Sequence, residues 1–218
     1  MLRRFFLSIL LCGAMGCDAL VQQFASAAVA TQANSGNREV LEDDAINIFL
    51  CGTGSPLPDA SSAAACTIVI AGGKLYVVDV GPGSQEVAQL GGMPRAELGG
   101  ILLTHFHSDH IDGLGEVGLV RWAGASHSEP LNVYGPEGVA DIVNGFNSAY
   151  QRDTVYRNDH HGDKVTPLSG AGMNPVSFAQ PDSGVLTTVY EQDGLKVEML
   201  AVDHFPINPA VAYRFSYK

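Results

Sequence analysis

The chain has 218 residues, a formal net charge of −11, 46% hydrophobic residues and 16% charged residues. This length and composition indicate one or two globular domains and exclude a disordered chain or a repeat array. An acidic chain repels the phosphates of nucleic acid, and no run of Lys or Arg forms a basic patch. A nucleic-acid partner is therefore not expected, unless metal ions offset the repulsion.

Residues 1–30 have the pattern of an export signal. Two arginines precede an apolar run over residues 5–11, which is too short to span a bilayer comfortably. Two processing sites compete: small residues allow cleavage after Ala30, and "AMGC", ending at Cys17, resembles a loose lipoprotein box. An uncleaved amphipathic anchor is the alternative. We expect an exported protein, periplasmic or extracellular, that is either released or held at the membrane by a lipid.

Residues 31–44 are polar and aperiodic, which predicts a linker before a single domain at residues 45–218. We expect strands at 46–50, 66–71, 75–80, 99–104, 187–192 and 195–202, one more at "LNVYGP", and a last strand beginning at "VAYRF". Helices are predicted at 84–90, 111–121 and 139–150, and residues 151–184 are predicted to be loop-rich. Hairpin turns at Gly72-Gly73 and Asp193-Gly194 indicate a mixed sheet in a layered α/β domain.

Two of the four cysteines lie in the predicted signal. The other two, Cys51 and Cys66, either form one disulfide in an oxidising compartment or remain two small buried thiols. Because both sit in apolar, strand-like runs, we favour the second interpretation. No CxxC spacing indicates a thiolate zinc site.

The segment "THFHSDHIDG" gathers four metal-ligating side chains within six residues, at the end of a predicted strand. His105 and His107 are two residues apart, so both imidazoles point to the same side of an extended chain. Asp109 and His110 follow where the chain turns into a helix, and they can face a second point nearby. Imidazole and carboxylate ligands suit Zn²⁺, with Mn²⁺ or Fe as alternatives. The spacing predicts half of a two-metal site.

This segment resembles the HxHxDH motif of the metallo-β-lactamase fold superfamily. Four other segments, "FLCGTGSPLP", "LYVVDVGPGS", "NVYGPEGV" and "VDHFPINPAVAYRF", are similar in sequence and order to the ribonuclease Z and arylsulfatase-like branch. Together the similar segments cover residues 46–218. The resemblance implies an α/β fold, a four-layer αβ/βα sandwich, and a hydrolase that uses two zinc ions.

Carried over position by position, the resemblance implies the ligands. His105, His107 and His204 would bind the first ion. Asp109 and His110 would bind the second, and Asp109 is also implied as a catalytic residue. His204 has separate support, because it ends a strand of alternating apolar residues and so lies at a sheet edge.

Three further residues have open roles. Asp79, at a predicted strand end, would either orient a metal-bound histidine or serve as a turn residue. His160 and His161 lie in "DHHGD", which is predicted to be a loop. It is similar to a His-His-Gly loop near the cleft of exported arylsulfatase-like members, which implies substrate contact; metal ligation and an ordinary surface position are the alternatives.

The chain departs from the family pattern at its C-terminal end. Family members carry two more ligands downstream, a bridging Asp and a final His, and nothing after Arg214 supplies them. We therefore expect a fragment, incomplete at the C-terminus. Without the bridging carboxylate, the second ion loses its main anchor.

These observations predict a dinuclear zinc hydrolase that acts on a phosphodiester or sulfate ester through a metal-bound hydroxide. Export and the negative charge favour a small-molecule ester over tRNA. The rivals are a β-lactam or lactone hydrolase of the same superfamily and an inactive metal-binding remnant. Membrane contact is expected only through a lipid anchor, and a homodimer is left open.

Overall fold

The computed structural model describes residues 36–218, so the predicted signal at residues 1–30 and the start of the predicted linker lie outside the described residues. The rest of the linker is folded. A 3₁₀ helix, η1 (Arg38–Leu41), places Val40 and Leu41 against the core. The Asn37 N–H donates to the Gly92 carbonyl at 2.7 Å. This part of the linker therefore packs on the domain, where its two apolar residues are partly buried.

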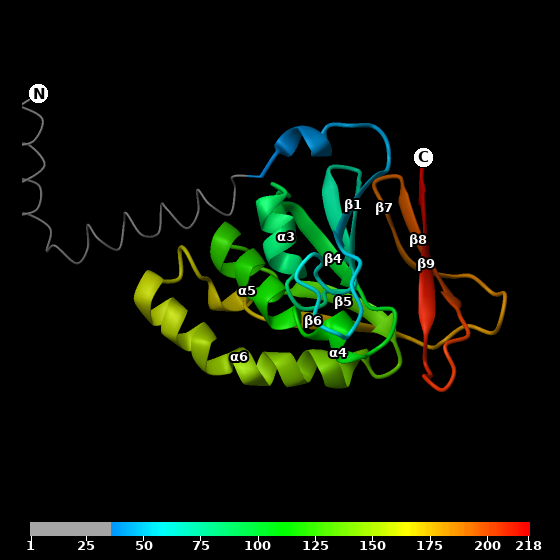
Figure 1. The fold of residues 1–218 in the computed structure, drawn as a ribbon. Helices are drawn as coiled ribbons and strands as arrows, with labels where there is room; N and C mark the ends of the chain where they lie inside the picture. Colours follow the sequence, from blue (N-terminus) through cyan, green and yellow to red (C-terminus); the bar gives the residue numbers. More distant parts are fainter. Residues whose placement is uncertain (1–35) are drawn as a thin grey trace, which may run out of the picture.

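Two β-sheets form the centre of the fold (Figure 1). The larger sheet has the order β1 (Asn47–Gly52), β2 (Cys66–Ala71), β3 (Lys74–Val78), β4 (Leu98–Leu102), β5 (Leu131–Pro136) and β6 (Met173–Phe178). The smaller sheet has the order β7 (Thr187–Gln192), β8 (Leu195–Ala201) and β9 (Val211–Tyr217). The β1–β2–β3 pairs are antiparallel, whereas β3 to β6 run parallel. The prediction of a mixed sheet is confirmed.

Helices cover one face of the larger sheet, and the smaller sheet lies on its other side (Figure 1). The helical segments are α3 (Ser84–Leu90), η2 (Arg95–Glu97), α4 (Ser108–Ile111), α5 (Leu114–Ala125), α6 (Val139–His161) and η3 (Leu168–Gly170). Side chains alternate along each strand: Leu75 and Val77 pack toward the helices, and Tyr76 packs toward the smaller sheet. Residues 36–218 thus form three of the four layers of the predicted sandwich.

The two sheets meet at the end of β4. The Val211 N–H donates to the Thr104 carbonyl at 3.0 Å, and the Tyr213 hydroxyl donates to the Leu103 carbonyl at 2.7 Å. The start of β9 is therefore fixed beside the segment that leads into His105. In the described part of the chain, no helix has the length and apolar character of a membrane span.

The prediction of a loop-rich segment at residues 151–184 is wrong. Helix α6 continues to His161, and β6 follows at Met173–Phe178. No Gly or Pro interrupts residues 151–161, and Gly162, at a φ of 76°, ends the helix. The second half of α6 lies beyond the core, so it lacks the apolar periodicity on which the prediction relied. Strand β6 contains Pro175, which is tolerated because β6 is an edge strand among the described residues.

The predicted helix at residues 111–121 is interrupted. The chain forms α4 and then α5, with Asp112 and Gly113 between them. The Gly113 N–H donates to the Val80 carbonyl at 2.8 Å, and a Cβ at this position would lie 2.7 Å from that oxygen. Close approach to the β3 end therefore requires glycine here and separates the two helices.

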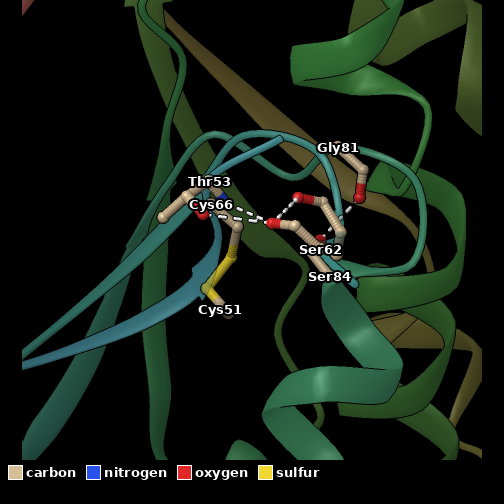
Figure 2. The surroundings of a disulfide bond; sticks show 7 residues. Cys51, Thr53, Ser62, Cys66, Gly81 and Ser84 are labelled. Carbon is tan, nitrogen blue, oxygen red and sulfur yellow. Dashed lines mark hydrogen bonds between the residues drawn. A yellow bond between two sulfur atoms is a disulfide. The ribbon is translucent and has the colours of Figure 1, made fainter. Parts of the chain in front are cut away.

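Our preferred interpretation of Cys51 and Cys66 as two separate thiols is wrong. The two residues form a disulfide, with Cα atoms 5.1 Å apart, between the end of β1 and the start of β2 (Figure 2). Antiparallel pairing of these strands places the two residues next to each other at the sheet end. Both cysteines are buried, so the apolar surroundings that suggested free thiols suit a disulfide equally well.

Candidate metal centre

His105 and His107 follow the end of β4 and lie at the start of the site. His105 is buried, whereas His107 is exposed and is the N-cap residue of α4. His105 Nε2 and His107 Nδ1 are 3.2 Å apart. Ligands at about 2.0–2.1 Å from a tetrahedral zinc ion are themselves roughly 3.3 Å apart. The two nitrogens therefore already have the spacing that one ion needs.

His204 reaches the same point from the second sheet. It lies in the loop between β8 and β9, which is closed by a 3.0 Å hydrogen bond from the Val202 N–H to the Ala210 carbonyl. Its ring centroid is 4.8 Å from that of His105 and 5.9 Å from that of His107. The ligand nitrogens of the three histidines all lie within 4.8 Å of one another. The fold thus brings His204 next to His105 and His107, although almost 100 residues separate them in the sequence.

Asp109 and His110 form a second pair of ligand atoms beside the first. His110 Nε2 and Asp109 Oδ2 are 3.5 Å apart, a spacing that also suits two ligands of one ion. Asp109 is buried, and the rings of His105 and His110 have centroids 4.1 Å apart. The two predicted halves of the site are therefore adjacent.

Asp79 holds His110 in the orientation that metal binding requires. Its Oδ2 lies 2.7 Å from His110 Nδ1, so in the neutral imidazole Nδ1 carries the proton and Nε2 has the lone pair. Asp79 itself is buried and adopts a left-handed φ of 58° at the end of β3. Asp79 thus lies beside the cluster with its carboxylate against His110, and its role in orienting a metal-bound histidine stays a prediction.

Thr104 links the two halves and was not singled out from the sequence. Its N–H donates to Asp79 Oδ1 at 2.8 Å, and its hydroxyl donates to Asp79 Oδ2 at 2.7 Å. Because the hydroxyl hydrogen is used there, Thr104 Oγ1 accepts from His105 Nδ1, 3.0 Å away. This leaves the lone pair of His105 on Nε2. The only signal in the sequence is a hydroxyl residue immediately before the first histidine.

Burial and neighbouring charges perturb the two inner histidines in opposite directions. Burial, followed by the nearby His110, lowers the pKa of His105 to about 4. Burial also acts to lower the pKa of His110, but the hydrogen bond to Asp79 and the charges of Asp79 and Asp109 outweigh it and raise that pKa. The His105 imidazole is therefore neutral down to acidic pH, whereas His110 would have to release a proton before it could bind a metal ion.

A cleft of about 650 Å³ opens beside Asp109, one member of the second pair. One wall is formed by most of residues 55–64, and the other contains Pro82, Ser108, Asp109 and Asp112. Among residues 36–218, no Lys or Arg lines this cleft. A substrate in the cleft would meet hydroxyls, carboxylates and apolar groups next to Asp109.

The comparisons with known proteins agree with this geometry. A family model described as "Metallo-beta-lactamase superfamily" matches residues 62–189, more than half of the chain. The chain belongs to the metallo-β-lactamase superfamily. A ribonuclease Z from Mycobacterium marinum is 38% identical over 174 residues, which are 79% of this chain and 59% of that protein. A ribonuclease Z from Mycolicibacterium paratuberculosis is 36% identical over 175 residues, with the same coverage.

The crystal structure of human tRNase Z, short form, superimposes with a TM-score of 0.61 at 16% identity, over 78% of this chain and 64% of that chain. The predicted resemblance to the metallo-β-lactamase superfamily and its ribonuclease Z branch is confirmed, as is the α/β fold. The chain spans about 59% of the length of these curated relatives. Its histidine cluster fits a superfamily whose members use zinc.

His160 and His161 do not join the cluster. They end helix α6 rather than lying in the predicted loop. The helix begins after Gly138, which packs against Phe106 beside the site, and its 23 residues extend about 34 Å from there at 1.5 Å per residue. The predicted substrate contact of these histidines stays a prediction.

Proposed function

We propose that this chain is a metal-dependent phosphodiester hydrolase of the ribonuclease Z type. The observation that carries the proposal is the convergence of His105, His107 and His204 on one point, next to the pair Asp109 and His110. In this proposal the three histidines hold one zinc ion, and Asp109 and His110 hold a second, with Mn²⁺ or Fe as alternatives. The ribonuclease Z relatives support phosphodiesters over sulfate esters.

When bound, zinc supplies an activated water near neutral pH and offsets the negative charge that develops on the phosphate oxygens. Residues of this chain orient the candidate metal ligands before any ion binds. The Thr104 hydroxyl accepts from His105 Nδ1, and Asp79 accepts from His110 Nδ1, so Nε2 of each ring is the nitrogen that would bind an ion. His110 first has to release the proton that its raised pKa favours. Asp109 lines the cleft, and its carboxylate lies 3.5 Å from His110 Nε2, so the residue that would hold the second ion adjoins the space for substrate. This is the basis for its proposed catalytic role.

The substrate remains a proposal within this class. The relatives are named as ribonucleases, and one solved structure is named a tRNase, so an RNA phosphodiester is one candidate. The net charge of −11 and the absence of Lys and Arg from the described lining of the cleft favour a small phosphodiester. Export, and with it a lipid or released form, is also proposed; the Cys51–Cys66 disulfide supports an oxidising compartment.

The test is hydrolysis by the zinc-loaded protein, expressed from its full reading frame. We expect turnover of bis-p-nitrophenyl phosphate, with none of nitrocefin and little of p-nitrophenyl sulfate. A precursor tRNA, assayed in parallel, separates the two phosphodiester candidates. Metal analysis should find about two zinc ions per chain. Zinc-loaded protein that cleaves neither phosphodiester would refute the proposal, and a metal-free protein would support an inert remnant.

A further inference from the structure

The loop of residues 52–65, which we call the disulfide-closed loop, joins β1 to β2 and forms one wall of the cleft. The disulfide between Cys51 and Cys66 closes it at its base (Figure 2). Its tip contains Pro56, Leu57 and Pro58, and Leu57 is 76% exposed. The tip therefore presents an apolar group toward a cleft that contains Asp109.

Inside the loop, hydrogen bonds connect its two arms. Ser62 Oγ accepts from the Thr53 N–H at 3.2 Å and lies 3.0 Å from the Thr53 hydroxyl (Figure 2). The Gly54 N–H donates to the Ala63 carbonyl at 2.8 Å. These bonds lie immediately beyond the disulfide, so the two arms stay together for several residues before the tip opens.

The loop is also bonded to the segment that carries the second pair of ligands. The Ala64 N–H donates to the Pro82 carbonyl at 3.1 Å, and the Gly81 N–H donates to the Ala65 carbonyl at 2.9 Å. One residue earlier, the Val80 N–H donates to the His110 carbonyl at 2.8 Å. A continuous set of backbone hydrogen bonds therefore runs from the loop to His110.

The packing along this path leaves no free space. A Cβ at Gly81 would lie 2.7 Å from the Ala64 Cβ and would clash with the Asp109 carbonyl. Gly81 also accepts from the Ser84 hydroxyl at 2.6 Å, at the start of α3 (Figure 2). The loop, the turn at residues 80–82 and the Asp109 segment are thus stacked in contact, and a displacement of the loop changes the cleft directly.

We propose that the Cys51–Cys66 disulfide positions the cleft for substrate, by holding the disulfide-closed loop as a preformed wall beside Asp109. This rests on the phosphodiesterase proposed above. A disulfide across 15 residues removes many conformations from the loop, and a loop that is ordered in advance does not have to be ordered when substrate binds. The ligands His105, His107 and His204 come from other segments, so opening the disulfide leaves zinc at the three-histidine cluster.

The experiment compares the zinc-loaded protein before and after reduction with tris(2-carboxyethyl)phosphine, which is then removed without oxygen. The disulfide, one phosphine and one water yield two thiols and the phosphine oxide, and mass analysis confirms that the protein has gained two hydrogens. We expect KM for bis-p-nitrophenyl phosphate to rise about tenfold with kcat nearly unchanged. Hydrogen exchange of residues 53–65 should accelerate, while zinc content at the three-histidine cluster stays the same.

The matched control is the Cys51→Ser/Cys66→Ser double variant. It should show the raised KM without reductant and should not respond to the phosphine, which separates this disulfide from Cys12 and Cys17. An unchanged KM and unchanged exchange after verified reduction would overturn the inference, as would loss of zinc from the three-histidine cluster. If the oxidised protein cleaves no phosphodiester, the proposed function fails instead, and the exchange measurement alone still decides whether the disulfide orders the loop.

Discussion

The two halves of the candidate metal centre are built in different ways. His105 and His107 meet His204 only because the second sheet docks on the first, and both His107 and His204 are exposed. Asp109 and His110 come from one short helix start, and Asp79 already fixes the imidazole of His110. The first half is assembled by tertiary contact, whereas the second is prepared by hydrogen bonds.

This difference assigns a different energetic role to each ion. In the proposed site, an ion at the three-histidine half would link the loop after β8 to the end of β4, so its binding free energy would stabilise the contact between the sheets. An ion at the second half would enter a pair of ligands that needs little rearrangement, because the supporting carboxylate of Asp79 is in place. The variants below separate these two contributions.

The largest effect is expected from His107→Ala. Removal of one of three imidazoles should abolish zinc retention at the first half and reduce phosphodiesterase activity by at least about a hundredfold. Metal analysis after dialysis and an assay with bis-p-nitrophenyl phosphate measure both losses. His127→Ala is the control, because His127 bonds to the Ala96 carbonyl away from the cluster. Undiminished zinc in the His107 variant would overturn the ligand assignment.

A smaller loss is expected from Asp79→Asn. The amide cannot accept all the bonds that the carboxylate accepts from Thr104 and His110, so affinity for the second ion should fall about 10- to 100-fold. The first ion should stay bound. Zinc titration that resolves two sites measures the difference, and Asp182→Asn, at an exposed loop position, is the matched control. If zinc affinity fell equally at both sites, Asp79 would not support the second half specifically, and the proposed difference between the two halves would be wrong.

Thr104→Val tests the link between the halves. It removes a hydroxyl that donates to Asp79 and accepts from His105, but it keeps the backbone N–H bond to Asp79. A net loss of about 1 kcal/mol per hydrogen bond predicts a several-fold weakening at each site. A Thr104→Ser variant retains the hydroxyl and should recover most of the affinity. Weakening at one site only would show that Thr104 supports just one half.

The smallest expected effect concerns the metal-free protein, in which His105 and His110 make the free energy of unfolding depend on pH in opposite ways. The pKa of His105 falls from its ordinary value of 6.5 to about 4, so its contribution to the free energy of unfolding decreases as pH drops from 6.5 toward 4. The pKa of His110 is raised, so its contribution is complete below pH 6.5 and is lost as pH rises through the raised pKa. Imidazole titration by NMR should show the two pKa values on opposite sides of 6.5. Two unperturbed titrations would contradict the hydrogen-bond pattern.

Local patterns predicted much of the fold and half of the site. The alternating and helical apolar patterns located nearly all strands and helices, and "THFHSDH" placed four ligand-type residues together. The patterns did not predict the segments that lack a periodic apolar face, or the hydrogen bonds between residues far apart in the sequence. The outer half of α6 and the edge strand β6 face too little core to show periodicity. The bond between Thr104 and Asp79 joins residues 25 positions apart, which no spacing rule indicates.

The hydrogen bond from Val211 to Thr104 also has a consequence for folding kinetics. It fixes the register between the second sheet and the end of β4, and His204 reaches the cluster only in that register. Contacts between residues about 100 positions apart form late in folding. The chain loses the conformational entropy of closing such a loop before the contact contributes any stability. Zinc capture by the three histidines is therefore expected to follow sheet docking during refolding. The time at which refolding protein first binds zinc would then report when the two sheets dock.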